Sequence, residues 1–176
     1  KHMAEVMLSD CVFAYPKLRA VALRYFNVAG ADGSGALTSV LLADKDASLL
    51  SAILKVARGK KDYLSVYGHD YETRDGTAIR DYIHVLDLVD AHLQALKFMD
   101  KEAGFHVFNL GHGEGYTVLE MVKQFEAVNQ VEIPINNEAR RSGDLMAVYA
   151  NPERALHALD WKPTRDLKRI VGDVWT

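Results

Sequence analysis

The chain has 176 residues, of which 49% are apolar, enough to build a hydrophobic core. Its 21 lysines and arginines against 24 aspartates and glutamates leave a net charge of −3. No stretch has the clustered basic residues of a duplex-binding face, so we expect no nucleic-acid partner. No window reaches the ~18 apolar residues of a membrane span, and the first residues lack a signal peptide's apolar run. We therefore expect a globular protein of the cytoplasm, without a membrane partner.

The first predicted element is a helix over residues 3–15, where apolar residues recur at helical spacing. The single cysteine, Cys11, excludes an internal disulfide and a cysteine-based zinc site, which suits a reducing compartment. It shares the apolar stripe with Leu8, Val12 and Tyr15, so we expect a buried thiol and not a nucleophile.

A buried strand is predicted next. Residues 21–28, VALRYFNV, are almost continuously apolar, β-branched or aromatic, as in a strand covered on both faces. The loop AGADGSG follows and can approach a ligand closely, because glycine permits positive φ and carries no side chain. A helix, SLLSAILKVARGK, is expected to end near Gly59, and YLSVYG is expected to be a short strand. This order of helices and buried strands indicates an α/β fold.

Residues 76–96 concentrate histidines and aspartates. Residues 81–85 alternate like a strand, and Asp87 is placed to be the N-cap of a helix with one buried face. A metal site formed by His84, Asp87 and His92 is disfavoured, because the capping carboxylate would have to turn away from its backbone donors. We expect no metal, and we interpret His92 as a helix-surface residue or a hydrogen-bonded core residue.

A second buried strand, residues 105–111, is followed by the glycine turn GHGEG. The turn lacks the G-x-G-x-x-G spacing because Tyr116 occupies the last glycine position, which favours an ordinary strand-to-helix turn over a dinucleotide loop. Thr117 and Glu120 form a T-x-x-E capping box that opens the next helix.

The C-terminal part is predicted to contain a short strand, VEIPI, a charged turn, ARRSGD, and a helix that opens at Asn151-Pro152. The last helical segment, DLKRIVGDVWT, has no stop signal, and Lys1 enters a helical pattern with no capping residue ahead of it. We therefore interpret the chain as part of a longer protein.

Polar residues that could bind a ligand lie at strand ends and in turns. Arg80 precedes a strand, and Arg141 lies three residues before Asp144. Arginines from separate segments suit a diphosphate. Spacing alone, however, favours the interpretation that both are solvated loop residues. Asn27 ends a buried strand, where α/β sheets place their ligand crevice, and spacing leaves its role open. Tyr25 points to the same side, and a tyrosine in a strand is more often a core residue.

Four segments in this order and spacing resemble the C-terminal half of the UDP-glucose 4-epimerases (UDP-galactose 4-epimerases) of the extended short-chain dehydrogenase/reductase family. They are LRYFNVAGA (23–31), YLSVYGHDYETRDGTAIRDYIHVLDLVDAH (63–92), FNLGHGEGYTVLEMV (108–122) and ARRSGDLMAVYANP (139–152). The resemblance implies that residues 1–176 comprise the last Rossmann strands and helices, interleaved with the smaller nucleotide-sugar-binding domain, and that the N-terminal NAD-binding half is absent.

The implied activity is that of an isomerase of galactose metabolism. Bound NAD takes a hydride from C4 of the UDP-sugar while the tyrosine of a Y-x-x-x-K motif takes the hydroxyl proton, and the hydride returns to the other face. The glycine-rich NAD loop and that tyrosine are missing from this chain. We therefore expect a full-length homodimer to be active and the chain alone to be inactive and prone to aggregation.

The resemblance also assigns roles position by position. Lys1 resembles the lysine of Y-x-x-x-K, unless His2-Met3 is a cloning scar, and Tyr25 resembles the tyrosine beside the nicotinamide. Asn27 resembles the asparagine that holds the UDP-sugar. Arg80 and Arg141 resemble the diphosphate-binding arginines, which reverses the interpretation from spacing alone.

The remaining assignments concern the nucleotide and the sugar. Asp144 resembles the acid that accepts from a ribose hydroxyl. Leu64, Ser65 and Tyr67 resemble residues of the strand that packs on uracil. Tyr82 is also assigned to the substrate site. Ser48-Leu49 replaces an asparagine or histidine followed by leucine, which puts that nucleotide contact in doubt. Val148 occupies a sugar-pocket position where a small residue predicts acceptance of UDP-N-acetylglucosamine and UDP-N-acetylgalactosamine.

Two alternatives stay open. Another NAD-dependent nucleotide-sugar epimerase or a dehydratase would share the fold, and only product analysis would separate it from a UDP-glucose 4-epimerase. A non-catalytic binding or regulatory member is a different class. The retained Asn27, Arg80, Arg141 and Asp144 argue against it, because a scaffold does not need a complete diphosphate and ribose set.

Overall fold

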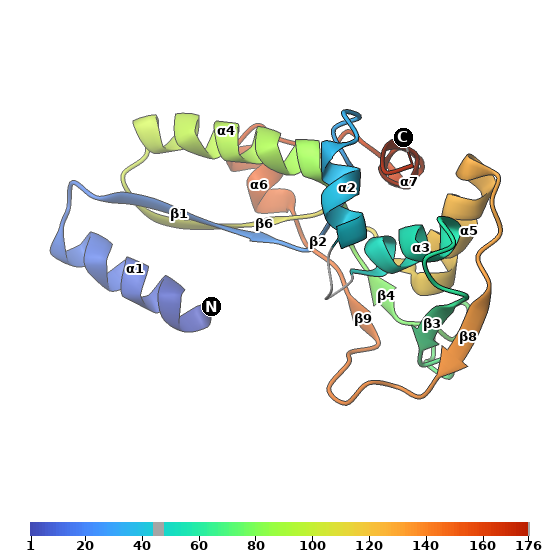
Figure 1. Cartoon of the computed structure of the whole chain (residues 1–176). Coiled ribbons are helices and arrows are strands. Elements are labelled where there is room, and N and C mark those ends of the chain that lie inside the picture. Colours follow the sequence, from blue (N-terminus) through green and yellow to red (C-terminus); the bar gives the residue numbers. More distant parts are fainter. Residues whose placement is uncertain (44–47, 176) are drawn as a thin grey trace.

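A computed structural model describes residues 1–43 and 48–175 and has the expected α/β class (Figure 1). The helices are α1 (His2–Ala14), α2 (Ala36–Ala43), α3 (Leu49–Ala57), α4 (Val85–Lys101), α5 (Val118–Asn129), α6 (Glu153–Ala158) and α7 (Leu167–Asp173). The strands are β1 (Arg19–Tyr25), β2 (Asn27–Ala29), β3 (Leu64–Tyr67), β4 (Ile79–Arg80), β5 (Tyr82–His84), β6 (Gly104–Leu110), β7 (Tyr116–Thr117), β8 (Ile135–Glu138) and β9 (Ala147–Val148). Within the described residues, no helix is both long and apolar enough to cross a membrane.

Most strand pairs are parallel and short. β1 pairs with β6, β2 with β5 and β3 with β8, whereas β4 lies between antiparallel β7 and parallel β9. The single strand predicted over 21–28 is divided because its partner changes. The Phe26 N–H donates to the Leu110 carbonyl, and the next N–H, of Asn27, donates to the Asp81 carbonyl. The chain thus passes from one partner strand to another within two residues.

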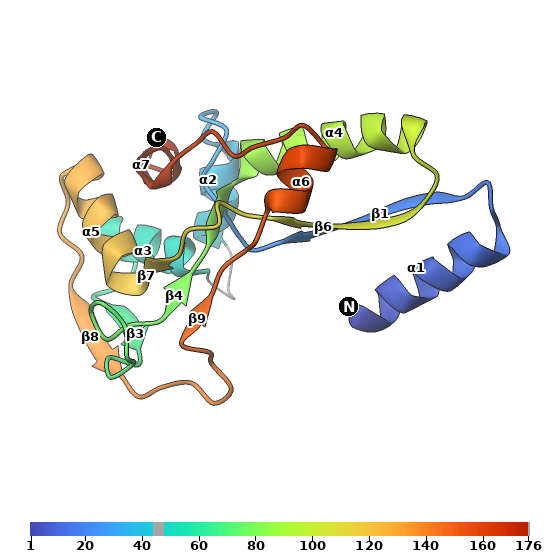
Figure 2. The ribbon, with the colours of Figure 1, turned by 180° about the vertical axis from the view of Figure 1, so that it is seen from behind.

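One end of the molecule, here called the ribbon region, consists of α1, β1, β6, α4 and α6. α1 and α4 lie on opposite sides of the paired β1 and β6 (Figures 1 and 2). Its core lies between β6, α4, α6 and the residues after α6; the buried members are Ile83, Leu88, Ala91, Phe108, Leu110, Ala155, Leu159 and Trp161. Phe98 adds an edge-to-face contact with Phe108, at a ring-centroid distance of 5.3 Å.

The expected burial of α1 is wrong. The helix forms as predicted, but none of its residues is buried, and Cys11 is exposed. Within the described residues the strand also lacks full cover, since residues of β1 are partly buried or exposed, as expected if its covering neighbours belong to the absent half. The apolar stripe predicted the helix from spacing alone, whereas burial requires a surface to pack against, which the described residues do not supply on this side.

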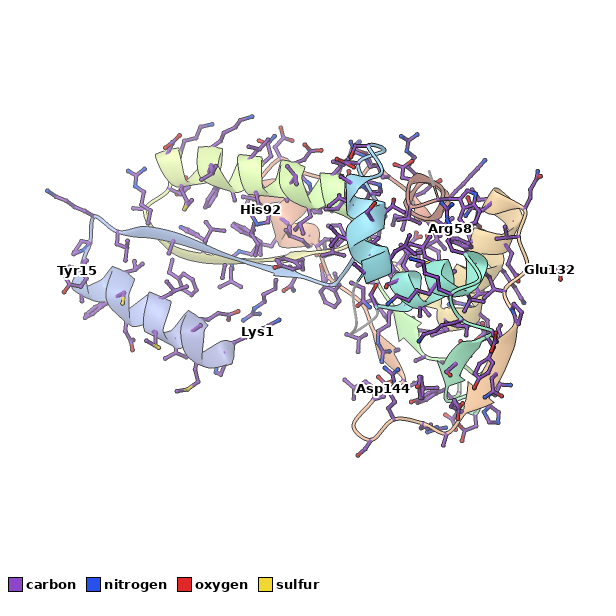
Figure 3. The ribbon with its side chains drawn as sticks, in the orientation of Figure 1. Lys1, Tyr15, Arg58, His92, Glu132 and Asp144 are labelled. Atoms are coloured by element: carbon purple, nitrogen blue, oxygen red, sulfur yellow. The ribbon has the colours of Figure 1, made fainter. Side chains whose placement is uncertain are left out.

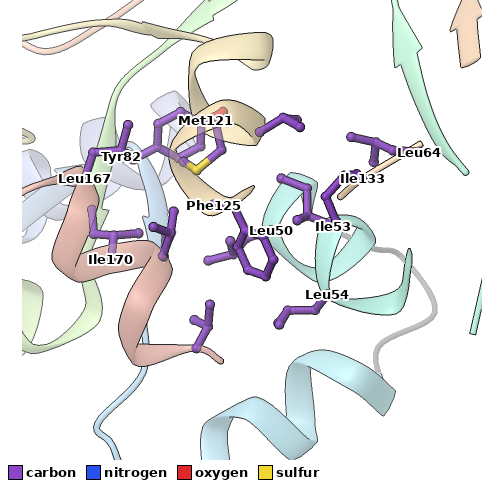
Figure 4. Close-up of a cluster of buried hydrophobic side chains, with 14 of the residues drawn as sticks. Leu50, Ile53, Leu54, Leu64, Tyr82, Met121, Phe125, Ile133, Leu167 and Ile170 are labelled. Carbon is purple, nitrogen blue, oxygen red and sulfur yellow. The ribbon is translucent and has the colours of Figure 1, made fainter. Parts of the chain in front are cut away.

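The other end, here called the pocket region, consists of α3, β3, α5, α7 and β8 around a larger core (Figure 4). Ile53, Leu54 and Phe125 are fully buried there. The helix starts are fixed by side chains. Ser48 accepts from the Ser51 N–H at 3.2 Å, and Thr117 and Glu120 make the predicted reciprocal capping box.

The cap of α4 differs from the prediction. His84 and not Asp87 is the N-cap, because the helix begins at Val85 and the His84 Nδ1 accepts from the Leu86 N–H at 3.1 Å. The Asp87 carboxylate is buried in the first turn, where it accepts from the backbone N–H groups of Thr164 and Arg165. Asp87 therefore anchors a distant segment of chain to α4.

Three further elements differ. The strand expected over 131–135 lies later, as β8, because Ile133 turns into the core and the Pro134 carbonyl accepts from the Leu64 N–H before pairing begins. α2 was not predicted from the sequence. The helix expected at Asn151-Pro152 begins at Glu153, whose N–H donates to the Asn151 side chain at 3.0 Å, so the expected capping contact forms one residue outside the assigned helix.

Candidate functional site

A cavity of about 640 Å³ lies between the start of α3, strand β3, the β4–β5 segment and the loop that precedes β9. Its wall gathers ten of the eleven side chains predicted to contact a nucleotide sugar. These are Asn27, Ser48, Leu49, Leu64, Ser65, Tyr67, Arg80, Tyr82, Arg141 and Asp144. Residues spread over more than 100 positions of the chain therefore meet at one site, although their roles there stay predictions.

Two arginines from separate segments contribute positive charge to the wall. Arg80 forms an ion pair with Asp144 and also donates to the Ile79 carbonyl at 2.7 Å, which leaves it mostly buried and held in one orientation. The Arg141 guanidinium lies over the Tyr67 ring, 3.7 Å from its centroid. Stacking occupies the face of the guanidinium and leaves its N–H edge available to anionic oxygens.

The cavity also contains an amide and a phenol side by side. Asn27 and Tyr82 are register partners in the β2–β5 pair, so their side chains lie on the same face. Burial raises the pKa of the Tyr82 phenol far above its usual value, against a smaller opposing effect of Arg80. Tyr82 therefore remains a neutral hydroxyl and can donate a hydrogen bond at any physiological pH.

The start of α3 presents a hydroxyl to the cavity. The Ser48 oxygen accepts from the Ser51 N–H at 3.2 Å, which fixes its position at the helix N-terminus. Since a hydroxyl can donate while it accepts, the capping bond leaves the Ser48 proton available to a ligand. The resemblance implies a larger polar residue at this position, so the contact of Ser48 with the nucleotide stays a prediction.

Asp81 organises this wall from behind. It alternates with the cavity residues Arg80 and Tyr82 along the segment, and its fully buried carboxylate accepts from the backbone N–H groups of His112, Gly113 and Ala150 at 3.0–3.1 Å. One carboxylate thus ties three segments together. Its position determines where the two neighbouring cavity residues point.

The glycine turn 111–115 is filled by protein. A Cβ added at Gly111 would lie 2.4 Å from Asp81 Oδ2, and one at Gly115 would lie 2.3 Å from Ile79 Cγ2. These glycines are needed because protein atoms occupy the space of a side chain. The packing agrees with an ordinary strand-to-helix turn and leaves no room at Gly111 or Gly115 for a pyrophosphate.

Three predicted residues lie outside the cavity wall. Lys1 is at the start of α1, in a different part of the molecule from Asp144 (Figure 3). Tyr25 ends β1 and is more than half exposed. Val148 is the register partner of Arg80 in the β4–β9 pair, so it lies on the same face just beyond the described wall.

The end of α1 that carries Lys1 and the end of β1 that carries Tyr25 lie toward each other. Glu5, one turn into the helix, forms an ion pair with Arg24 next to Tyr25, at 2.7 Å between Arg24 Nε and Glu5 Oε1. Lys1 and Tyr25, the two predicted cofactor contacts, therefore lie toward the carboxyl end of the parallel strand β1. This is the edge of the sheet where α/β folds bind ligands.

Six wall residues were not predicted from the sequence: Ala52, Lys61, Tyr63, Val66, Ala78 and Val118. The helical spacing of Ala52 from Ser48 could have indicated that both face one side. Lys61 and Tyr63 carried no signal, because their placement depends on how the chain turns after α3.

The histidines and aspartates of residues 76–96 have separate partners. His84 Nε2 lies 3.2 Å from Asp173 Oδ2, whereas the His92 ring hydrogen-bonds the Leu88 carbonyl on the exposed side of α4. Among the residues that the structure describes, no group of three or more histidine, cysteine or acidic side chains could hold a metal ion.

Comparison with known proteins identifies the family of the chain. The profile of the NAD dependent epimerase/dehydratase family matches residues 1–111. The UDP-glucose 4-epimerase of Pasteurella multocida is 45% identical over 180 residues, which cover 99% of this chain and 52% of that protein.

Solved structures agree. The UDP-glucose 4-epimerase of Stenotrophomonas maltophila with bound NAD and formylated UDP-arabinopyranose superimposes with a TM-score of 0.91 at 36% identity, covering 99% of this chain and 52% of that one. That of Bifidobacterium longum in complex with NAD+ and UDP gives 0.83 at 36% identity, with 99% and 51% covered. The chain spans about half the length of these relatives.

Proposed function

Because the chain belongs to the NAD dependent epimerase/dehydratase family, we propose that it supplies the UDP-sugar site of a longer enzyme that interconverts UDP-glucose and UDP-galactose. The reaction is an NAD-dependent oxidation and reduction at C4 of the sugar. The supporting observation is the single cavity that gathers the ten predicted substrate contacts.

The chemistry of the wall matches a nucleoside diphosphate. Arg80 and Arg141 come from separate segments and provide fixed donors for the diphosphate oxygens. The Asp144 carboxylate accepts from a ribose hydroxyl, while β3 packs against uracil. Asn27 and neutral Tyr82 then donate to the sugar end.

The described residues include two predicted contacts to NAD, outside the cavity. Lys1 and Tyr25 are the predicted contacts, and the glycine turn 111–115 is filled by protein atoms. We therefore assign the cofactor mainly to polypeptide outside this chain, where bound NAD would accept and return the hydride. Residues 1–176 orient the UDP-sugar, and the chain alone is expected to be inactive.

The assignment can be tested in the full-length protein with a matched pair of arginines. Arg141 lines the cavity, whereas its neighbour Arg140 pairs with Asp70 at 2.6 Å and stacks on Tyr71 away from the cavity. We expect Arg141→Met to raise KM for UDP-galactose roughly tenfold and Arg140→Met to leave it nearly unchanged.

The products of this assay separate the alternatives. Formation of UDP-glucose supports the epimerase, a 4-keto-6-deoxy sugar indicates a dehydratase, and UDP-sugar binding without turnover indicates a non-catalytic member. Equal effects of the two arginine substitutions would show that the cavity is not the substrate site.

A second candidate substrate is favoured by Val148. This residue is the register partner of Arg80, so it lies on the same face of the β4–β9 pair, and its side chain is smaller than a tyrosine. We propose that UDP-N-acetylglucosamine and UDP-N-acetylgalactosamine are also accepted. Val148→Tyr should lower kcat/KM for the acetylated sugars relative to the plain sugars, and an unchanged ratio would contradict the proposal.

We also propose that the full-length protein is a cytoplasmic homodimer. α1 supports this, because it has no buried residue and exposes Met3, Met7 and Phe13. Light scattering during size-exclusion chromatography would measure the mass of the assembly, and a monomer at micromolar concentration would contradict the proposal.

A further inference from the structure

The helix α1 contacts the rest of the described chain along one narrow face. Glu5 and Val12 are half-buried, whereas every other residue of α1 is exposed. These two residues lie seven positions apart and therefore share one side of the helix. That side faces β1 and β6, which α1 contacts (Figure 1). An apolar contact such as that of Val12 has no preferred direction, so the orientation of α1 depends on the polar contact of Glu5.

The polar contact is an ion pair with Arg24 of β1 that has two hydrogen bonds. Arg24 Nε donates to Glu5 Oε1 at 2.7 Å, and Arg24 Nη2 donates to Glu5 Oε2. Two parallel hydrogen bonds fix the plane of the carboxylate as well as its distance from the guanidinium. The hydrogen bonds from Arg24 also lower the pKa of Glu5, so the pair is charged at physiological pH.

The pair also determines where the start of α1 lies. The Glu5 N–H donates to the Lys1 carbonyl at 3.2 Å, so the two residues belong to the same hydrogen-bonded turn and lie on the same side of the helix. Figure 3 shows Lys1 at the end of α1 nearer the pocket region and Tyr15 at the far end. A rotation of α1 about its axis would therefore move Lys1 relative to the carboxyl end of β1, where Tyr25 follows Arg24.

We infer that the Glu5–Arg24 pair positions Lys1 for the cofactor-dependent step of the full-length enzyme. The inference rests on the proposed function and on the role that the resemblance implies for Lys1. Neither Glu5 nor Arg24 lines the cavity. Both act through the first turn of α1, so they are positioning residues, and the UDP-sugar binds without contacting them.

The pH dependence of kcat distinguishes positioning from a direct effect of charge. The resemblance implies that the Lys1 ammonium group favours the ionised form of the tyrosine of the Y-x-x-x-K motif, which lies outside this chain. Displacement of Lys1 would raise the pKa of that tyrosine. Loss of either partner, in Glu5→Gln or Arg24→Met, should therefore move the acidic limb of the kcat profile to higher pH by about one unit. A direct charge effect would move it in opposite directions, because removing a carboxylate favours tyrosinate and removing a guanidinium disfavours it.

The test uses the full-length protein loaded with NAD. The control is Asp70→Asn, which removes the exposed ion pair with Arg140 after β3 and leaves α1 unchanged. We expect Glu5→Gln and Arg24→Met to lower kcat roughly tenfold and to keep KM for UDP-galactose within about twofold, since the cavity residues are unchanged. Asp70→Asn should behave like the wild type.

Two further variants examine the pair as a unit. The double variant of Glu5→Gln and Arg24→Met should lose no more kcat than either single variant, because the same interaction is removed in each case. Arg24→Lys keeps the charge but not the two parallel hydrogen bonds, so it should retain part of the activity. Losses that multiply in the double variant would show that the two residues act separately and would overturn the inference.

Hydrogen exchange measures the attachment of α1 independently of activity. In the full-length protein, amide exchange of residues 2–14 followed by mass spectrometry should be faster in Glu5→Gln than in the wild type or Asp70→Asn, while exchange of α5 stays the same. Wild-type exchange and kcat in Glu5→Gln would overturn the inference, as would an acidic limb at lower pH or a raised KM. If the wild-type protein neither binds NAD nor epimerises UDP-galactose, the proposed function itself fails, so the two failures are distinguishable.

Discussion

The ribbon region and the pocket region use apolar side chains in different ways. In the ribbon region α1 has no buried residue and Phe13 is 90% exposed, whereas Phe125 in the pocket region is fully buried. Helices of this chain cover the core of the pocket region, since α5 and α7 pack against each other and share one core with α3. The ribbon region presents apolar surface that the described residues leave uncovered.

This difference between the two regions explains why the cavity lies in the pocket region. A binding cavity needs side chains held in place, and its wall residues come from elements attached to the buried core or to the Asp81 carboxylate. The ribbon region has one parallel strand pair, β1 and β6, with helices on both sides, and within the described residues the apolar side chains of α1 stay exposed.

The largest expected effect compares two phenylalanines. Phe125→Ala should lower the free energy of unfolding by about 3–5 kcal/mol, because it removes a fully buried ring. Phe13→Ala should change it by less than about 0.5 kcal/mol in this chain. Urea unfolding followed by circular dichroism measures both. A large loss for Phe13→Ala only in the full-length protein would show that sequence outside this chain covers α1.

A smaller effect compares two aspartates. Asp81→Asn replaces one of the two buried carboxylate oxygens, which together accept from three backbone N–H groups, with an amide donor and should cost about 2–3 kcal/mol. Asp70→Asn removes an exposed ion pair with Arg140 and should cost much less. Unfolding midpoints in urea test this. Comparable losses would mean that Asp81 does not hold the segments of the wall together.

The smallest effect concerns pH and His84. Burial lowers the pKa of His84, against the opposing effect of the hydrogen bond to Asp173, so the native state binds fewer protons than the unfolded state. The associated stability is complete above the unfolded pKa of about 6.5 and is lost as pH falls through it toward the lower native value.

The control variant is His84→Asn, which keeps an acceptor at the N-cap of α4 but does not titrate in this range. Unfolding midpoints from pH 7 to pH 5 should fall more steeply for the wild type than for this variant. Parallel slopes would show that His84 is not the group responsible for the acid sensitivity.

Local chemistry made several elements predictable. The capping box of Thr117 and Glu120 involves residues three positions apart, and the helix over 3–15 follows from spacing alone, so neither depends on distant contacts. Asp87 shows the limit of this reasoning. Its residue type suited an N-cap, but Thr164 and Arg165, more than 70 positions away, provide its partners.

The candidate site likewise contains residues that the sequence predicted and residues that it did not. Motifs in the four segments indicated eight wall residues, and the resemblance added Ser48 and Leu49 by position. The structure brings all ten into one cavity without testing their roles. Lys61 was missed because its position at the cavity wall depends on the turn that the chain makes at Gly59. Cys11 was expected to be buried and is exposed. A helical stripe shows that one face of the helix is apolar, but it does not show what covers that face.

The sequence by itself determined the α/β class, the main helices with the capping box of Thr117 and Glu120, and the resemblance that suggests a UDP-sugar site, since each depends on neighbouring residues or on short motifs. The tertiary structure alone decided which apolar faces are buried, which acids serve as anchors, and which cations meet at the cavity. These properties depend on contacts between segments far apart in the chain, and no spacing within a single segment contains that information.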